Sequence, residues 1–254
     1  MNRLAIAACL AIPMLVGPAP VAAQTVIGAA ETIETSVTGD ADRSIQQGSS
    51  IHANERIRTN RSGLGHFEFL DGTKLVIGPD SNLLLDELVY NPNTSSFRKV
   101  VLKASSGATR FISGKSNSSA FKIITPIGAL GLRGTAFDFR HWRGRTYLMV
   151  LDGVVEICNR RNDCRTLRRK CDFVVVDRDG EISDPIQPSR GIFSAFDMAK
   201  YFPFVSNQGR LDPGYRLRIN TCAGGNNGNN SVGGEGGDTG FDSSGSNGGT
   251  GSGT

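Results

Sequence analysis

Histidine and tryptophan are scarce in this chain of 254 residues, which contains three histidines and one tryptophan. So few of these residues argue against a histidine-rich metal centre and against a site of stacked aromatic rings. His52, His66 and His141 lie in separate segments with no HxH or HxxxH spacing, and no GxSxG nucleophile motif is present. We therefore expect a protein that is not an enzyme and has no cofactor and no metal.

Long apolar runs are missing outside the N-terminal region. Residues 1–23 combine a positive start, an apolar run from Leu4 to Val16, and small residues before Gln24. This order is typical of a cleaved secretory signal peptide, and the apolar run is shorter than the roughly 18 to 20 residues that span a bilayer. We expect cleavage after Ala23, no membrane span afterwards, and a periplasmic or secreted protein.

Positive charge is absent from the last segment, residues 223–254, which consists mostly of Gly, Asn and Ser. Val232 and Phe241 are its only apolar side chains larger than alanine, too few to offset the entropy of ordering. We expect this tail to be disordered. The whole chain carries a formal charge of +4, without the dense basic stripe of a nucleic-acid binder. We expect no nucleic-acid partner.

Four cysteines remain after the expected cleavage, and an even number in an exported chain suggests disulfides, for which three pairings exist. Cys158 and Cys164 flank a polar turn and can face each other across a hairpin. That pairing leaves Cys171 for Cys222. The spacings differ from the paired CxxC of zinc ribbons, so a zinc site is disfavoured.

Helical periodicity is almost absent, and strand-like segments recur about every 8 to 12 residues, which is typical of an all-β fold. An Asp-Gly pair, a hairpin signal, occurs at Asp71-Gly72, Asp152-Gly153 and Asp179-Gly180. We expect an antiparallel-rich, twisted β-solenoid or sandwich-like domain. Its expected strands include residues 64–69, 75–77, 83–90, 97–104, 109–113, 121–124, 135–139, 146–151, 154–158 and 173–176.

The expected β-rich domain covers residues 24–183, with a core over 48–157. Residues 184–222 lose the alternation and gain four prolines, so we expect an irregular C-terminal extension over the β-rich body. A short helix is expected over Ser194–Tyr201.

Two blocks of sequence and a short segment after them form a recognisable set of motifs. The first block runs from Gly48 to Leu85 and contains FEFLDGTKL, and the second is TPIGALGLRGTAF, from Thr125 to Phe137. The segment DGVV follows at residues 152–155. Together these motifs resemble the FecR domain family. The motif residues, which we expect to be structural or to contact a partner, are Asp71, Gly72, Thr125, Pro126, Gly131, Arg133, Gly134 and Thr135.

The resemblance implies a strand-built, extracytoplasmic module that contacts other proteins. The namesake members of the family sense an outer-membrane receptor and control an iron-responsive sigma factor. We therefore expect a non-enzymatic protein that acts by protein–protein contact in periplasmic signalling or scaffolding. Its expected partner is an envelope or periplasmic protein.

The glycines of the second block are spaced GxxGxxG, unlike the GxGxxG of a dinucleotide loop, and the next segment is an expected strand rather than a helix. A structural explanation is better. Pro126 ends a strand, and the glycines permit turns or close backbone approach. Arg133 is expected to bridge backbone carbonyls or a carboxylate, with a ligand contact as the alternative.

Cations gather between Arg160 and Lys170, with Asp163 the only acid among them. They form either the solvated rim of a hairpin or an edge that contacts an acidic partner or an anionic envelope polymer. The second possibility defines our alternative function, an envelope glycan-binding, anionic-polymer-binding or adhesive protein. A second basic turn surrounds Trp142, which is either an exposed contact or a packed hairpin cap. The candidate contact edge is Arg160, Arg161, Arg168 and Arg169.

Overall fold

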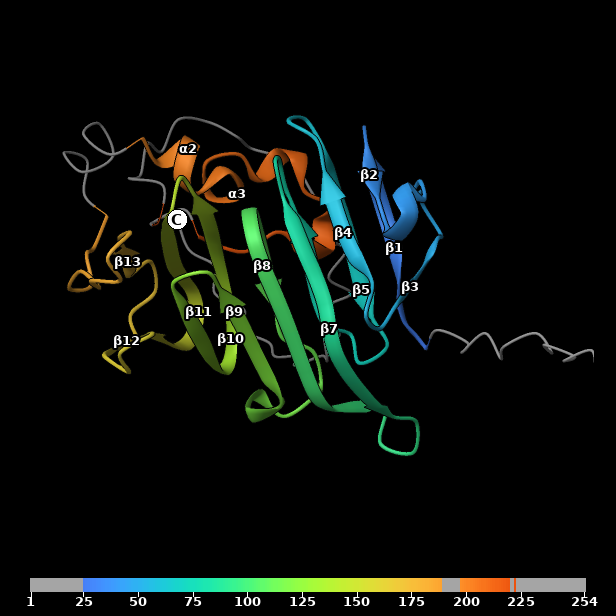
Figure 1. Cartoon of the computed structure of the whole chain (residues 1–254), viewed down its shortest axis with the longest axis horizontal. Helices are drawn as coiled ribbons and strands as arrows, with labels where there is room; N and C mark the ends of the chain where they lie inside the picture. Colours follow the sequence, from blue (N-terminus) through green and yellow to red (C-terminus); the bar gives the residue numbers. More distant parts are fainter. Residues whose placement is uncertain (1–24, 189–196, 220–221, 223–254) are drawn as a thin grey trace, which may run out of the picture.

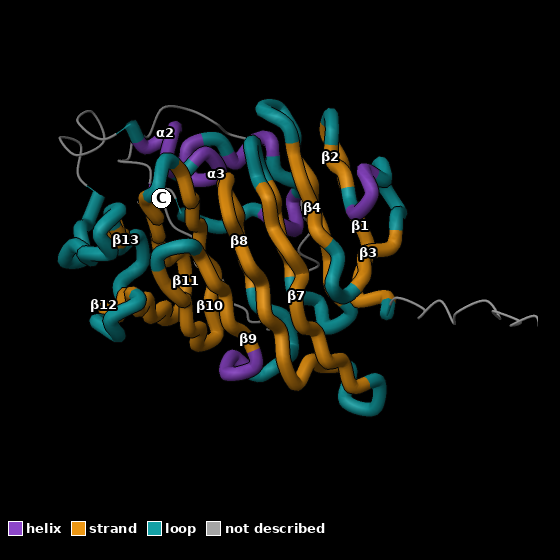
Figure 2. Tube along the Cα trace, in the orientation of Figure 1, coloured by secondary structure: helices purple, strands orange, loops and turns teal. Residues whose placement is uncertain are grey.

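Thirteen strands form one continuous sheet that folds over into two layers (Figures 1 and 2). The computed structural model describes residues 25–188, 197–219 and 222. The expected signal peptide and tail lie outside these residues, as does the start of the expected helix. The strands are β1 (Val26–Glu34), β2 (Val37–Thr38), β3 (Ser50–His52), β4 (Arg56–Thr59), β5 (Leu64–Phe69), β6 (Lys74–Ile77), β7 (Asn82–Asn91), β8 (Ser96–Ile112), β9 (Phe121–Thr125), β10 (Gly128–Trp142), β11 (Arg145–Asn159), β12 (Cys164–Leu167) and β13 (Phe173–Val176).

Three long strands, β8, β10 and β11, pass through both layers. Their halves at 107–112, 136–142 and 145–149 pair within the first layer, which also contains β3, β1, β5, β6 and β13. Their other halves lie in the second layer and pair there with β7, β9 and β12, while β4 pairs with β7 and β2 with β4. Almost all of these pairings are antiparallel. The exception among the described strands is the parallel pairing of β8 with β9.

The main core lies between the two layers, because alternate side chains of each strand point inward. Phe111 and Phe137 stack with ring centroids 5.3 Å apart, and Phe121 meets Phe111 from the second layer at 5.2 Å. Each large apolar side chain that is fully buried stabilises the fold by about 1.5–3 kcal/mol. This core holds the layers together and leaves two outer faces.

The C-terminal extension covers the outer face of the first layer. It contains the short helices α2 (Met198–Tyr201) and α3 (Pro203–Ser206) and the 3₁₀ turns η3 (Gln208–Arg210) and η4 (Pro213–Tyr215), shown in orange in Figure 1. Their apolar side chains form two further buried clusters with the first layer. In one of them, the ring centroids of Phe202 and Phe173 are 5.9 Å apart. The first layer is therefore buried on both faces, and the second on one.

The Asp-Gly pairs do not all make hairpins. Asp71-Gly72 connects β5 to β6 as predicted, with Gly72 at φ +81°. The hairpin predicted at Asp152-Gly153 is wrong, because both segments belong to β11. Gly153 bends that strand between the layers at φ +73°, where a Cβ would lie 2.0 Å from the carbonyl oxygen of Gly134.

Two other long strands contain a bend of the same kind. The predicted strands 97–104 and 109–113 are one strand up to Ile112, β8, which bends at Gly107 (φ +92°). The glycines of the second family block, from Gly128 to Gly134, and the strand predicted after them all lie in β10. In the sequence, a glycine of this kind is typical of a turn between two strands. Here its left-handed backbone bends one long strand, so that the two halves of the strand lie in different layers.

Helices are short throughout the described part of the chain, and none there has the length and apolar character needed to cross a membrane.

Candidate functional site

The outer face of the second layer is open to solvent and carries the residues of the second family block. Strand register places Lys122, Gly131, Glu156 and Thr166 side by side across β9, β10, β11 and β12. Arg133 on β10 pairs with Val154 on β11. Extending the β11–β12 register by one residue places Arg168 on the far side of Val154.

These rows surround a cleft of about 320 Å³. The loop before β9 closes one side of it, because the Gly134 N–H donates a hydrogen bond to Ser118 Oγ. We name this hollow the motif cleft, and its lining includes Ser118, Gly131, Arg133, Val154, Glu156 and Arg168.

Arg133 does not have the bridging role expected from the sequence. Its side chain is exposed in the motif cleft and has no hydrogen bond or ion pair within residues 25–188, 197–219 and 222. A register shift in β10 between Arg133 and Ala136 accompanies the passage between layers. The irregular backbone therefore presents the guanidinium at the open face.

The remaining motif residues near the cleft are structural in their contacts. Thr125 and Gly128 close the two-residue turn that contains Pro126, because Thr125 Oγ1 accepts from the Gly128 N–H at 3.2 Å. Thr135 is 2 % exposed, and its backbone carbonyl oxygen accepts a hydrogen bond from the Ser113 N–H at 3.0 Å. These residues set the end of β9 and the course of β10.

Asp71 joins the β5–β6 turn to the loop that borders the cleft. It is 1 % exposed and accepts hydrogen bonds from the Thr73 N–H at 2.9 Å and from Ser116 Oγ at 2.5 Å. The Gly114 N–H donates to Thr73 Oγ1. This network fixes a turn and a loop, as the Asp-Gly pattern indicates, and it positions the chain leading to Ser118.

Three arginines of the candidate basic edge lie outside the motif cleft, and one lines it. Arg160 and Arg161 lie in the β11–β12 turn, where hydrogen bonds from Asn159 and Arg161 lower the pKa of Asp163. Arg169, beyond β12, lies 3.4 Å from the buried carboxylate of Asp172. Arg168 instead lines the motif cleft with Arg133, a grouping that sequence spacing did not indicate.

The second basic turn packs around Trp142, which is half-buried. Tyr201 of the extension meets its ring edge-on at 6.0 Å, and Arg143 and Lys200 lie over it at 4.4 and 4.6 Å. These contacts favour the packed hairpin cap over a free aromatic contact.

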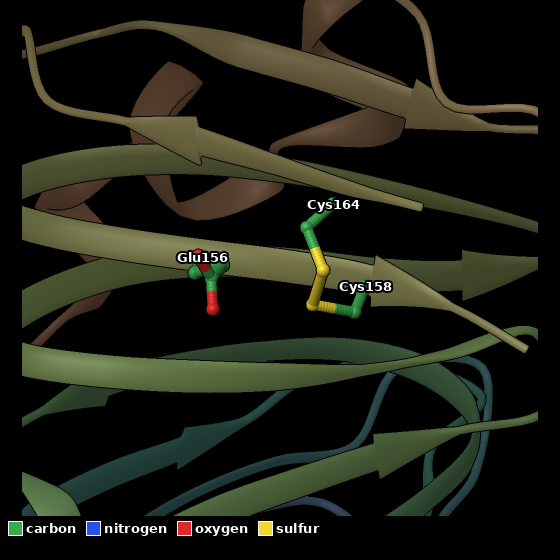
Figure 3. A group of neighbouring side chains, drawn as sticks. All are labelled: Glu156, Cys158 and Cys164. Carbon is green, nitrogen blue, oxygen red and sulfur yellow. A yellow bond between two sulfur atoms is a disulfide. The ribbon is translucent and has the colours of Figure 1, made fainter. Parts of the chain in front are cut away.

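The two disulfides have the pairing that the hairpin argument predicts. Cys158 bonds to Cys164 across β11 and β12, and Cys171 bonds to Cys222. Glu156 projects beside the first disulfide (Figure 3), so three potential metal-ligand atoms lie within 4.8 Å of one another. Both sulfurs are bonded to each other and neither is a thiolate, so this group is a poor metal site.

A buried ion pair lies beneath the extension, away from the cleft. Arg110 and Asp138 make two contacts, at 2.6 and 2.8 Å, and neither side chain is more than 2 % exposed. Burial raises the pKa of Asp138, and the Arg110 charge opposes that rise. Arg110 also donates to Gln208 Oε1 at 3.2 Å. Arg110 and Asp138 are 28 residues apart in the sequence, and no motif or spacing indicated that they pair.

Comparison with known families identifies the domain that contributes most of the cleft lining. Residues 55–156 match the model of the FecR protein family. The matched stretch runs from the start of β4 into β11 and includes Gly131 and Arg133. The chain therefore contains a FecR domain, as the two sequence blocks predict.

Two solved structures are similar in part. Both are crystal structures of a protein described as a candidate anti-sigma factor from Parabacteroides distasonis, at 2.50 and 1.65 Å resolution. Identity is 16 % in each case, and the TM-scores are 0.43 and 0.42. The match covers 56 % of this chain and 64 % of theirs. The search of curated proteins returned no match.

Proposed function

We propose that this FecR-domain protein is a non-enzymatic, extracytoplasmic protein that acts by contact with another protein, in periplasmic signalling or scaffolding. The domain match supports a role of this regulatory kind. The Parabacteroides protein bears an anti-sigma-factor description, in line with the same role.

The observation that carries the proposal is the difference between the two outer faces. One is covered by residues of the chain's own extension, and the other is open and carries Arg133 and Arg168 in a cleft. Exposed arginines at a concave site are typical anchors of protein interfaces. The partner therefore binds the open face of the second layer.

An extracytoplasmic location has two supports. The N-terminal pattern is that of an export signal, and both disulfides suit an oxidising compartment.

The test is a quantitative cross-linking pull-down from a periplasmic extract of the source cell. The baits are the wild-type protein, the double variant Arg133→Gln/Arg168→Gln, and the control Arg61→Gln. Arg61 is an exposed arginine in the β4–β5 turn, outside the cleft. We expect one envelope protein to be recovered equally by wild type and control, and to fall by on the order of tenfold or more with the double variant. Equal recovery by all three baits, or no enriched protein, contradicts the proposal.

The second candidate function is binding of an anionic envelope polymer by the basic edge. Its support is that Arg160 and Arg168 form no ion pair in the part of the chain that the structure describes. The matching test measures salt-sensitive retention on purified lipopolysaccharide or cell wall. Charge reversal at Arg160, Arg161, Arg168 and Arg169 then abolishes retention, and unchanged retention excludes the basic edge.

A further inference from the structure

We propose that the motif cleft is a carboxylate-recognition site that binds a short acidic segment of the protein partner, with Gly131 as its floor. This inference rests on the proposed function and names the chemistry of the partner.

Gly131 has no structural reason to be glycine. Its backbone is extended within β10 and is not among the glycines with positive φ. A Cβ built on it meets no atom within 4 Å, whereas one on Gly128 would lie 2.5 Å from the Cys158 carbonyl oxygen. Glycine weakens a strand interior. Because Gly131 has no side chain, the space above its backbone in the cleft stays open.

The charges around that space are complementary to a carboxylate. Arg133 and Arg168 flank Val154 from two neighbouring strands, so their Cα atoms lie about 10 Å apart, twice the strand spacing. Lys122 is exposed on the other side of Gly131. None of the three cations has an ion-pair partner among the described residues. A planar guanidinium binds a carboxylate through two parallel hydrogen bonds.

The single acid of the cleft restricts where an anionic group can bind. Glu156 lies one row from the arginines, opposite Gly131. A second carboxylate beside it is repelled, while a backbone N–H or hydroxyl of the bound segment finds an acceptor there. The site therefore suits one acidic side chain followed by a small neutral residue over Gly131, rather than a long polyanion.

The volume supports a short segment. About 320 Å³ lies at the lower end of the range for small-ligand sites. It accommodates one side chain and its adjacent backbone, not a folded element.

The experiment is selection from a random linear-peptide display library on the purified, oxidised protein, with Gly131→Val for counter-selection. Valine suits an extended position and fills the floor, so this variant is expected to fold with an equal or higher Tm while losing binding. The matched control is Ala129→Val, which lies two residues earlier on β10 and outside the cleft lining.

We expect enriched peptides to contain Asp or Glu and to bind wild type and Ala129→Val equally. Affinity should fall by on the order of tenfold for Arg133→Gln and for Arg168→Gln, and when the acidic residue is replaced by its amide. Enrichment of neutral or basic peptides, equal binding to Gly131→Val, or no enrichment over that variant overturns the inference.

Failure here is distinguishable from failure of the proposed function. If the pull-down partner depends on Arg133 and Arg168 while no acidic peptide is selected, protein contact stands and the carboxylate chemistry is wrong. If acidic peptides are selected but no envelope protein is recovered, the cleft binds its ligand and the proposed signalling contact is wrong.

Discussion

The outer faces of the first and second layers share the three long strands β8, β10 and β11 but have opposite environments. On the first, Arg110 and Asp138 are buried under the extension and satisfy each other. On the second, Arg133 and Arg168 are exposed in a cleft. A charged side chain on a strand therefore has a structural or a binding role according to what covers it, and the covering segment is remote in sequence.

Breaking the covered ion pair gives the largest expected effect. Arg110→Met leaves Asp138 buried without its partner and is expected to lower the free energy of unfolding by about 3–5 kcal/mol. Urea denaturation at neutral pH measures this change. The control is the double variant Arg110→Met/Asp138→Leu, which removes both charges and should recover most of the loss. A double variant as unstable as the single one contradicts the assignment.

The two disulfides test how firmly the extension is held. Replacing both Cys171 and Cys222 by serine removes the bond that holds the end of the extension, across a sequence separation of 51 residues. The expected decrease in the free energy of unfolding is about 3–4 kcal/mol. The disulfide between Cys158 and Cys164 spans only 6 residues. Replacing both by serine should therefore lower the free energy of unfolding by only about 2 kcal/mol. Denaturation of both variants provides the comparison. Equal losses would indicate that the covering segment is held by packing rather than by its bond.

Sequence predicted the β class, the family and both disulfides because each depends on local pattern: alternation, two motif blocks and a cysteine-flanked turn. It misassigned Asp152-Gly153 because a bend and a hairpin need the same left-handed glycine. It also missed the grouping of Arg133 with Arg168, which depends on the register of three strands. Local rules specify neither strand register nor the face that an extension covers.

The smallest expected effect is a pH dependence of the free energy of unfolding, caused by a histidine buried at the covered face. His66 is fully buried under the ring of Tyr215, whose centroid is 4.8 Å away, and its Nδ1 lies 3.4 Å from Asp212. Burial lowers the pKa of His66, and this effect outweighs the attraction of Asp212 and Glu34. Below pH 6.5, the ordinary pKa of histidine, His66 takes up a proton in the unfolded chain but remains neutral in the native state. His66 thus contributes its full stability above that pH, and the contribution falls as the pH drops toward the lowered native value.

Urea denaturation at pH 7.5 and 5.5 measures this loss. His66→Phe keeps a ring of similar size beneath Tyr215 and should reduce the difference between the two pH values. Some difference should remain, because burial also lowers the pKa of His141. If wild type and His66→Phe lose the same stability on acidification, His66 is not what makes the covered face sensitive to pH, and the contrast between the two faces reduces to the ion pair and the disulfide.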